Sequence, residues 1–340
     1  MTNLAPYHSF ALPYQAMGYQ TFNSVQALQQ AAQTQALFDR PHLILGEGSN
    51  TIFSCDYDGT IIRLLNHELS VTEDQHFTYL SVDGGYPWHQ LVGWALDNGI
   101  YGLENLALIP GTVGAAPIQN IGAYGVQFED FCQYVEYLDK NTLEIVRLNK
   151  SELQFAYRNS LFKGGLKDQT VITKVGLKLP KAWRPVLSYG GLDVLAQNCQ
   201  PRQLFDKVIE IRRSKLPDPA QIPNAGSFFK NPLVSQSLVT SLSSTYPKLP
   251  KFQVDEHHQK IPAAWLIEQC GLKGAAIGGI SIYQQHALII TNQHQGTGGQ
   301  LLELIELVRA KVYQQFGIEL EPEVRVMGKC QPYSFCAIKA

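Results

Sequence analysis

Residues 109–125 read Ile109-Pro110-Gly111-Thr112-Val113-Gly114-Ala115-Ala116-Pro117-Ile118-Gln119-Asn120-Ile121-Gly122-Ala123-Tyr124-Gly125, a run with few bulky side chains. Glycine costs about 0.5–1 kcal/mol per position in regular structure, so this density needs a physical reason. We expect the backbone to approach a ligand closely here. The alternative is a tightly packed turn that binds nothing.

An earlier loop of the chain also contains glycines and reads Leu43-Ile44-Leu45-Gly46-Glu47-Gly48-Ser49-Asn50; it is called the first loop below, and residues 109–125 the second loop. It indicates a buried strand followed by a turn whose backbone amides can converge on phosphate oxygens. The start is similar to the Rossmann fingerprint, but Thr51 replaces the third glycine and residues 52–56 do not predict a helix, so we exclude that domain. A plain strand-turn-strand corner explains this loop taken alone. Together, the two loops favour a large, flat, diphosphate-bearing cofactor such as FAD.

Composition limits the function classes. The chain has 340 residues, of which 45% are hydrophobic and 16% charged, which indicates a folded protein of two or three domains. The formal net charge is -2 and basic residues are scattered, so we expect no nucleic-acid partner. No segment approaches the ~18 apolar residues of a membrane span, and residues 1–10 show no targeting pattern. We therefore expect a cytoplasmic protein that does not bind membranes.

The sequence gives little support for a disulfide framework or for a metal site. The 6 cysteines lie far apart without a CxxC pair, so we interpret them as reduced thiols. The run Asp255-Glu256-His257-His258 lacks the spacing of a strong zinc motif, and we expect no metal.

The chain divides near Leu216-Pro217-Asp218-Pro219, where two prolines make a continued helix improbable. After this point, periodicity predicts helices at 263–270 and 300–316 over a second sheet that contains 287–291 and 324–327. Before it, a helix is expected at 88–97, with strands at 43–45, 61–65, 79–82, 135–138, 144–148 and 171–179. The irregular order of strands and helices favours several small α+β layers over a barrel or a doubly wound sheet.

Three polar residues stand in unusual settings. Arg158 lies in a predicted loop beside Tyr157 and can clamp a carboxylate through two hydrogen bonds. Ser227 precedes two phenylalanines in residues 224–232 and is interpreted as a proton donor, because the residues around it do not form a nucleophile elbow. The alternative for Arg158 is an ordinary surface arginine. The alternative for Ser227 is a serine in a turn or at a helix N-cap.

Glu323 lies in the run Glu321-Pro322-Glu323-Val324-Arg325. We expect Glu323 and Arg325 on one face of a strand, and burial would disfavour the charged form of Glu323. An ion pair at a strand edge is the alternative.

Five motifs, at 45–50, 109–125, 157–160, 224–232 and 321–325, closely resemble in this order the UDP-N-acetylenolpyruvoylglucosamine reductase family. The similarity spans nearly the whole chain, and the loop at Tyr157 resembles the type I branch. It implies an α+β fold of the FAD-binding PCMH (vanillyl-alcohol-oxidase) type, with two small α+β subdomains and a C-terminal α+β substrate domain. The implied domains are 1–66, 67–216, 217–322 and a returning segment, 323–340.

The resemblance also implies a reaction. NADPH reduces FAD, and the flavin N5 passes a hydride to UDP-N-acetylglucosamine enolpyruvate, which yields UDP-N-acetylmuramate for the bacterial cell wall. By matching positions, Arg158 and Glu323 stabilise the enolate-like state and Ser227 delivers the proton. We expect a monomer.

The same matching assigns the remaining site residues. The FAD-binding residues implied are Gly46, Glu47, Gly48, Ser49, Asn50, Pro110, Gly111, Thr112, Gly114, Ala115, Gln119, Asn120, Gly122, Ala123, Tyr124, Gly125 and Arg213. The substrate-binding residues implied are Tyr157, Tyr189, Lys215, Asn231, Phe252, Lys273, His286 and Arg325. Phe252 stands where type I relatives can carry a tyrosine that reaches the diphosphate, and His286 where a glutamine can stand.

Two other functions stay open from the residues alone. A flavin oxidase of the same superfamily, acting on an alcohol or sugar, would explain the glycine-containing loops but not Ser227 together with Glu323. A nucleotide-binding regulatory module without chemistry is the second alternative.

Overall fold

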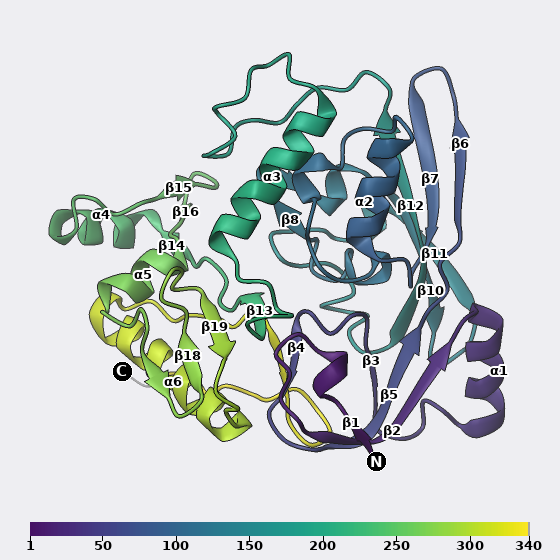
Figure 1. The fold of residues 1–340 in the computed structure, drawn as a ribbon, viewed down its shortest axis with the longest axis horizontal. Coiled ribbons are helices and arrows are strands. Elements are labelled where there is room, and N and C mark those ends of the chain that lie inside the picture. The colour runs from purple at the N-terminus through teal and green to yellow at the C-terminus, as the bar shows by residue number, and fades with distance from the viewer. Residues whose placement is uncertain (339–340) are drawn as a thin grey trace. The chain divides into compact units, whose positions relative to one another are not determined.

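The computed structural model describes residues 1–338, which form two compact units (Figure 1). The central unit comprises Gly18–Glu47 and Gly59–Ser214. The C-terminal unit comprises Met1–Met17, Gly48–Asp58 and the described chain from Lys215 on. The break at Lys215 lies next to the predicted proline-rich boundary, whereas the expected subdomain 1–66 is shared between the two units.

The main sheet of the central unit has five antiparallel strands, β11-β10-β12-β7-β6 (Figure 1). Their bounds are β6 Leu69–Glu73, β7 Phe77–Asp83, β10 Cys132–Asp139, β11 Ile145–Asn149 and β12 Thr170–Pro180. Strands β7, β10 and β12 contain the stretches that the sequence predicts for them, and β11 begins one residue after the start of the predicted 144–148. No strand was expected at β6.

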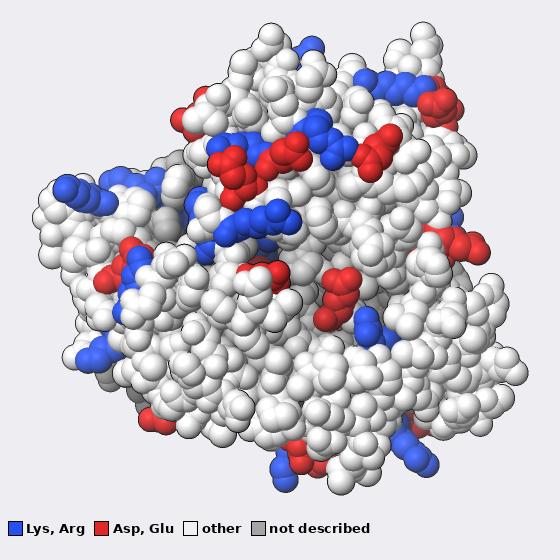
Figure 2. Space-filling view, in the orientation of Figure 1, with Lys and Arg blue, Asp and Glu red and all other residues white. Residues whose placement is uncertain are grey.

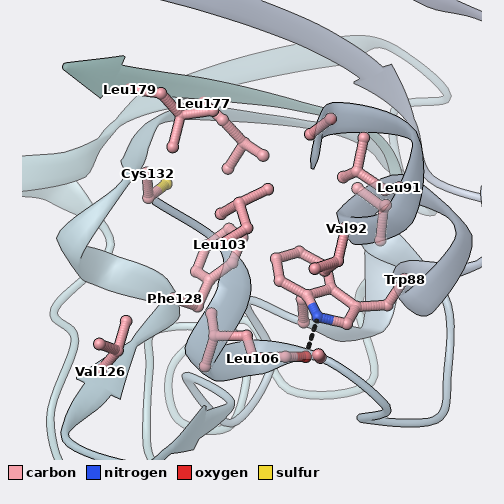
Figure 3. Close-up of a cluster of buried hydrophobic side chains, with 14 of the residues drawn as sticks. Trp88, Leu91, Val92, Leu103, Leu106, Val126, Phe128, Cys132, Leu177 and Leu179 are labelled. Atoms are coloured by element: carbon pink, nitrogen blue, oxygen red, sulfur yellow. Dashed lines mark hydrogen bonds between the residues drawn. The ribbon is translucent and has the colours of Figure 1, made fainter. Parts of the chain in front are cut away.

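Helix α2 (Trp88–Asp97) has the predicted bounds, and its five predicted apolar residues are all buried. They pack with Leu80 and Val82 of β7 and Leu177 and Leu179 of β12 in one core cluster (Figure 3). The Trp88 indole N–H donates to the Leu106 carbonyl at 3.1 Å, so the buried polar atom of this large ring is satisfied. Helix α3 (Pro201–Lys215) contributes to the same cluster through Leu204, Phe205, Val208 and Ile211.

A smaller layer of the central unit is built from β5 (Tyr57–Leu64) and β3 (His42–Ile44), which pair in parallel. Helix α1 (Val25–Gln35) buries Leu28, Ala31 and Ala32 in a cluster with Ile62 and Leu64 of β5. The unit's remaining short elements are the hairpin β8 (Gly122–Ala123) with β9 (Val126–Gln127), and 3-10 helices at Glu104–Leu106, Val113–Ala115, Phe128–Asp130 and Lys150–Glu152.

The C-terminal unit contains the sheet β13-β19-β18-β17, formed by Asn224–Ser227, Ile289–Asn292, Ile280–Ile282 and Ala276–Ile277. Helices α5 (Ala263–Gln269) and α6 (Gly298–Phe316) share its core. Helix α6 begins with a capping box between Thr297 and Gln300 and ends at Gly317 with φ 65, the left-handed residue expected at a helix end.

Other elements of this unit complete its surface. A small sheet, β14-β16-β15, is formed by Leu233–Ser235, His258–Lys260 and Phe252–Gln253, with α4 at Gln236–Thr245. Near the N-terminus, β1 (Thr2–Asn3) pairs with the start of β2 (Gln15–Phe22), and Ala5–Tyr7 form a 3-10 helix.

One predicted pairing is wrong. Strand β20 (Arg325–Met327) does not join β19 in the second sheet, but pairs in parallel with β4 (Thr51–Phe53). Apolar character alone does not specify a strand's partner. The result is that the C-terminal segment returns to the stretch directly after the first glycine-containing loop.

Among the described helices, none combines the length and apolar character that crossing a bilayer requires. All 6 cysteines are free thiols, as predicted.

The core accounts for a first prediction. Replacement of the fully buried Leu91 by alanine should lower the free energy of unfolding by about 2–5 kcal/mol, because it removes buried methyl groups and leaves a cavity. The exposed neighbour Gln90 provides the control, and Gln90→Ala should change it by no more than about 0.5 kcal/mol. Urea unfolding monitored by tryptophan fluorescence measures both. Equal effects of the two substitutions would contradict the assignment of this face to the core.

Candidate active site

The first glycine-containing loop leaves β3 and enters a strand, because β4 begins at Thr51. This confirms that the loop does not open a Rossmann helix. Within the central unit, the Gly111 backbone N–H donates to Glu47 Oε2 at 2.8 Å. A Cβ placed on Gly46 would lie 3.1 Å from Thr112 Oγ1. The start of this loop therefore lies against the second loop.

The second loop is shaped partly by the protein's own backbone. The Gly114 N–H donates to the Gly84 carbonyl at 2.8 Å, and a Cβ on Gly114 would lie 2.9 Å from that oxygen. Packing therefore explains Gly114 without a ligand, contrary to our expectation for the run as a whole. Further along, Tyr124 and Gly125 have φ 51 and 85, as a two-residue hairpin turn between β8 and β9 requires.

Arg158 occupies a tight turn in the central unit, closed by two hydrogen bonds of 3.1 Å between Ala156 and Asn159. Its φ of 53 is unusual for a residue with a side chain, and such strain is often found at functional sites. The Arg158 Nη2 donates to the Gly122 carbonyl at 2.9 Å. The guanidinium therefore lies directly beside the second loop.

Two further hydrogen bonds hold this turn. Asn120 Nδ2 donates to the Ala156 carbonyl at 3.2 Å, and Ser160 Oγ donates to the Ile118 carbonyl at 2.7 Å. The buried Asn120 thus has a structural role in addition to the FAD-binding role that was predicted for it. The Arg158 guanidinium lies over the Tyr157 ring, 5.5 Å from the centroid of that ring.

A neighbouring arginine was missed by the sequence analysis. Arg213 is exposed, whereas the Nε of Arg212 is shielded from solvent and has no hydrogen-bond partner among residues 1–338. Burial lowers the pKa of Arg212, Tyr124 opposes this shift, and Arg158 lowers the pKa further. Helical spacing could have identified it, because Arg212 is four residues after Val208 on the buried side of α3.

Tyr189 is exposed and lies against Tyr124, with their rings edge to face and centroids 5.1 Å apart. This predicted substrate residue is therefore in contact with the second loop.

Ser227 and Glu323 are brought together in the C-terminal unit. The Glu323 N–H donates to the Phe228 carbonyl at 2.8 Å, directly next to Ser227. The Ser227 side chain is exposed, while Phe228 and Phe229 are buried beneath the strand. The exposed Ser227 hydroxyl is thus held in place by the two buried residues that follow it.

Glu323 differs from its prediction. It is half-buried and lies in the bend before β20, so it does not share a strand face with Arg325. Pro322 forms a bridge with Phe229, which explains why the strand begins only later. The Asn50 Nδ2 donates to the Glu323 carbonyl at 3.2 Å, and the Arg325 N–H donates to the Asn50 carbonyl at 3.0 Å.

A charged cluster in the same unit unites three predicted substrate residues. Lys273 Nζ lies 2.9 Å from Glu268 Oε1, and Lys215, Lys273 and Glu268 all act electrostatically on the half-buried His286. Positive charge close to an imidazole is the kind of arrangement that binds a diphosphate.

The other predicted substrate residues have separate settings. Asn231 Oδ1 accepts from the Ala263 N–H at 2.9 Å and so caps α5. Phe252 is exposed on β15. The run 255–258 forms a turn in which Asp255 Oδ1 accepts from the N–H groups of His257 and His258 at 2.8 and 2.9 Å. Within residues 1–338, no cluster of His, Cys, Asp and Glu suits a metal ion.

The surface carries charges of both signs. On the face shown in Figure 2, lysines and arginines are interspersed with aspartates and glutamates.

Comparison with known proteins agrees with this geometry. Residues 18–149 match the model of an FAD binding domain, and residues 218–327 match the C-terminal domain of UDP-N-acetylenolpyruvoylglucosamine reductase. The reductase of Pasteurella multocida (strain Pm70) is 49% identical over 331 residues, 96% of each chain. That of Haemophilus ducreyi is 44% identical over 328 residues, 96% of this chain and 95% of the relative.

A solved structure shows the same fold. The chain is similar to UDP-N-acetylenolpyruvylglucosamine reductase from Thermus caldophilus, with a TM-score of 0.66 and 24% identity over 96% of this chain and 97% of that one. The matched domains and the paired loops define an α+β flavoprotein with an FAD-binding domain. Within that class, the chain belongs to the UDP-N-acetylenolpyruvoylglucosamine reductase family.

The residues present fit FAD. The shielded Nε of Arg212 has no hydrogen-bond partner among residues 1–338, and Tyr124 of the second loop acts electrostatically on this guanidinium, so a bound cofactor would supply a missing acceptor. The predicted FAD-binding glycines at positions 111, 114, 122 and 125 lie in the same loop.

The contact between the two loops gives the second prediction. Glu47→Ala should weaken FAD binding about tenfold, because the Gly111 N–H loses its acceptor at a cost of about 1–3 kcal/mol. Glu47→Gln keeps an acceptor oxygen and should bind FAD nearly as well as the wild type. Titration of the apoprotein with FAD, followed by flavin fluorescence, measures both affinities. An equal loss in both variants would show that the charge, and not the hydrogen bond, is what matters.

Proposed function

We propose that this chain uses NADPH and FAD to reduce UDP-N-acetylglucosamine enolpyruvate to UDP-N-acetylmuramate, a precursor of peptidoglycan. The observation that carries the proposal is that Ser227 and Glu323, the proposed acid and stabilising group, are adjacent in one backbone ladder. Family membership supports the same substrate, since the relatives are named as reductases of the enolpyruvyl sugar.

FAD bound to this chain supplies the hydride that reduces the double bond. The residues proposed to hold it are those of the two loops, from Gly46 to Asn50 and from Pro110 to Gly125. Arg212 adds a positive charge beside Tyr124. A fixed cation favours whatever negative charge the cofactor gains on reduction.

The chain's own residues manage the charge and the proton of the substrate. Arg158 is proposed to pair with the substrate carboxylate, because a guanidinium offers two parallel donors and stays charged. Negative charge that develops next to that carboxylate is then stabilised, and the Ser227 hydroxyl donates the proton that completes the lactyl ether. Glu323, in the bend before β20, is proposed to contribute with Arg158 to stabilising the enolate-like state.

Serine is a feeble acid, so its role needs a strongly basic acceptor and a fixed position. The antiparallel bridge of Phe229 with Pro322 and the bond from the Phe228 N–H to the Leu288 carbonyl, 2.8 Å, provide the fixed position. Positioned acids of this kind contribute about 10²–10⁴-fold to a rate.

We also propose that the protein acts in the cytoplasm as a monomer. Both NADPH and nucleotide sugars are cytoplasmic metabolites, which supports the compartment. The monomeric state stays a prediction that sedimentation velocity can test.

A third prediction follows from the role of Ser227. In Ser227→Ala, NADPH should still reduce the flavin at nearly the wild-type rate, because no proton from serine is needed there. Reoxidation by the enolpyruvyl substrate should slow by about 10²–10⁴-fold. Anaerobic stopped-flow absorbance separates the two half-reactions.

Ser227→Cys is the matched control, since a thiol of similar size can also donate a proton, and it should retain more of the second half-reaction than alanine does. Equal slowing of both half-reactions in Ser227→Ala would rule out the proton-donor role.

Arg212 and Arg213 give a fourth prediction from a matched pair. Arg212→Met should lower the two-electron potential of the bound flavin by about 30–60 mV, because each 30 mV corresponds to about 1.4 kcal/mol of lost charge stabilisation. Arg213→Met, at the exposed neighbour, should leave the potential unchanged. Equilibration with redox dyes measures it. A shift in Arg213→Met alone would support the predicted position of Arg213 near the flavin and contradict this role of Arg212.

A further inference from the structure

We propose that His286 couples substrate binding to proton uptake: it is neutral in the free protein and becomes charged when a diphosphate diester binds beside Lys215 and Lys273. This inference rests on the proposed function, because it takes a nucleotide sugar as the ligand. It concerns the C-terminal unit alone.

The turn that carries His286 is packed closely against the segment that carries Lys273. The Gly274 N–H donates to the Ile282 carbonyl at 3.1 Å, and the Ile282 N–H donates to the Ala275 carbonyl at 2.8 Å. A Cβ on Gly274 would lie 2.1 Å from Gln284 Nε2, so no gap separates the two segments. Lys273 is therefore fixed close to the turn.

The same turn is linked to Ser227. The Leu288 N–H donates to His286 Nδ1 at 3.3 Å, and the Leu288 carbonyl accepts from the Phe228 N–H at 2.8 Å. The imidazole is thus bonded to Leu288, two residues along the chain, and Leu288 is bonded to Phe228, the residue after Ser227.

The charged groups around His286 carry too little positive charge to neutralise a diphosphate diester. The charged groups that act on His286 are Glu268 of α5, Lys273 after it and Lys215 at the end of α3. Two lysines and one glutamate provide one net positive charge, and Lys273 is already paired with Glu268 at 2.9 Å. A diphosphate diester carries two negative charges. A protonated His286 supplies the second positive charge.

The free protein favours the neutral ring. Burial lowers the pKa of His286, Glu268 raises it, and Lys215 and Lys273 lower it. A bound dianion raises this pKa, since a nearby opposite charge favours the charged form. Affinity for the ligand should therefore increase as the pH falls from the bound-state pKa towards the lower pKa of the free protein.

Only one nitrogen of the neutral His286 ring can take up the proton. Because the Leu288 N–H donates to Nδ1, the neutral ring carries its hydrogen on Nε2, and protonation must occur at Nδ1. This breaks a bond of 3.3 Å, which is long for a hydrogen bond and so opposes protonation only weakly.

The test uses UDP-N-acetylglucosamine, whose diphosphate diester does not itself titrate near neutral pH. Calorimetric titration of the oxidised holoenzyme in two buffers of different ionisation enthalpy measures the protons taken up. We expect uptake of a fraction of a proton near pH 7, and about tenfold tighter binding at about pH 5.5 than at about pH 8.5.

Two variants isolate the ring. His286→Gln should bind with no linked proton and with an affinity that varies little with pH. His286→Lys should also take up no proton but should keep tight binding at high pH, because its charge is permanent over this range. The flavin absorbance and melting temperature of both variants verify folding, and the wild-type proton count alone decides the matter if a variant misfolds.

Binding of UDP-N-acetylglucosamine to the wild type without proton uptake overturns the inference but leaves the proposed function intact. Equal proton uptake by His286→Gln overturns it as well. A flavin-loaded wild type that binds no UDP-N-acetylglucosamine contradicts the proposed function, and with it this inference.

Discussion

The C-terminal unit depends on a set of backbone hydrogen bonds between segments that are far apart in the chain. Residues 228–230 bond to residues 321–323, and residues 50–54 bond to residues 325–327. The Ser54 Oγ adds a bond of 2.8 Å to the Met327 carbonyl. Backbone donors are buried at a cost unless they are paired, so this ladder is obligatory for folding. It also holds Ser227, Glu323 and Asn50 close to one another, so the geometry on which the proposed chemistry relies is set by the fold itself.

The central unit uses a different principle. Its two loops have few side chains, and arginines lie beside them: Arg158 donates to Gly122, while Arg212 approaches Tyr124. A strained turn holds one guanidinium and the buried side of a helix holds the other. If FAD binds at these loops as proposed, main-chain atoms shape its site and two positive charges lie beside it.

Local structure could be predicted from the sequence where a single periodic pattern decides it. Helix α2 has its predicted bounds and buried face because five apolar residues recur at helical spacing before an Asn-Gly stop. Pairing between distant segments could not be predicted in this way. Strand β20 joins β4 rather than β19, and Glu323 is in a bend because Pro322 bridges to Phe229. Gly114 is required by the carbonyl of Gly84, which no local pattern reveals. The structure places Ser227 and Glu323 in neighbouring segments, and their chemical roles stay predictions. The shielding of Arg212 depends on the orientation of α3, which the single prediction for Arg213 did not include.

The central claim is that this chain is a flavoenzyme whose reduced form is consumed by an enolpyruvyl sugar nucleotide. The most direct measurement is anaerobic mixing of the purified yellow protein with NADPH, followed by UDP-N-acetylglucosamine enolpyruvate. The account predicts prompt bleaching of the flavin absorbance and its full return on addition of the enolpyruvyl substrate, with UDP-N-acetylmuramate as product. A reduced flavin that ignores this substrate and returns only with oxygen would contradict the account and indicate an oxidase, and a colourless protein would exclude flavin chemistry altogether.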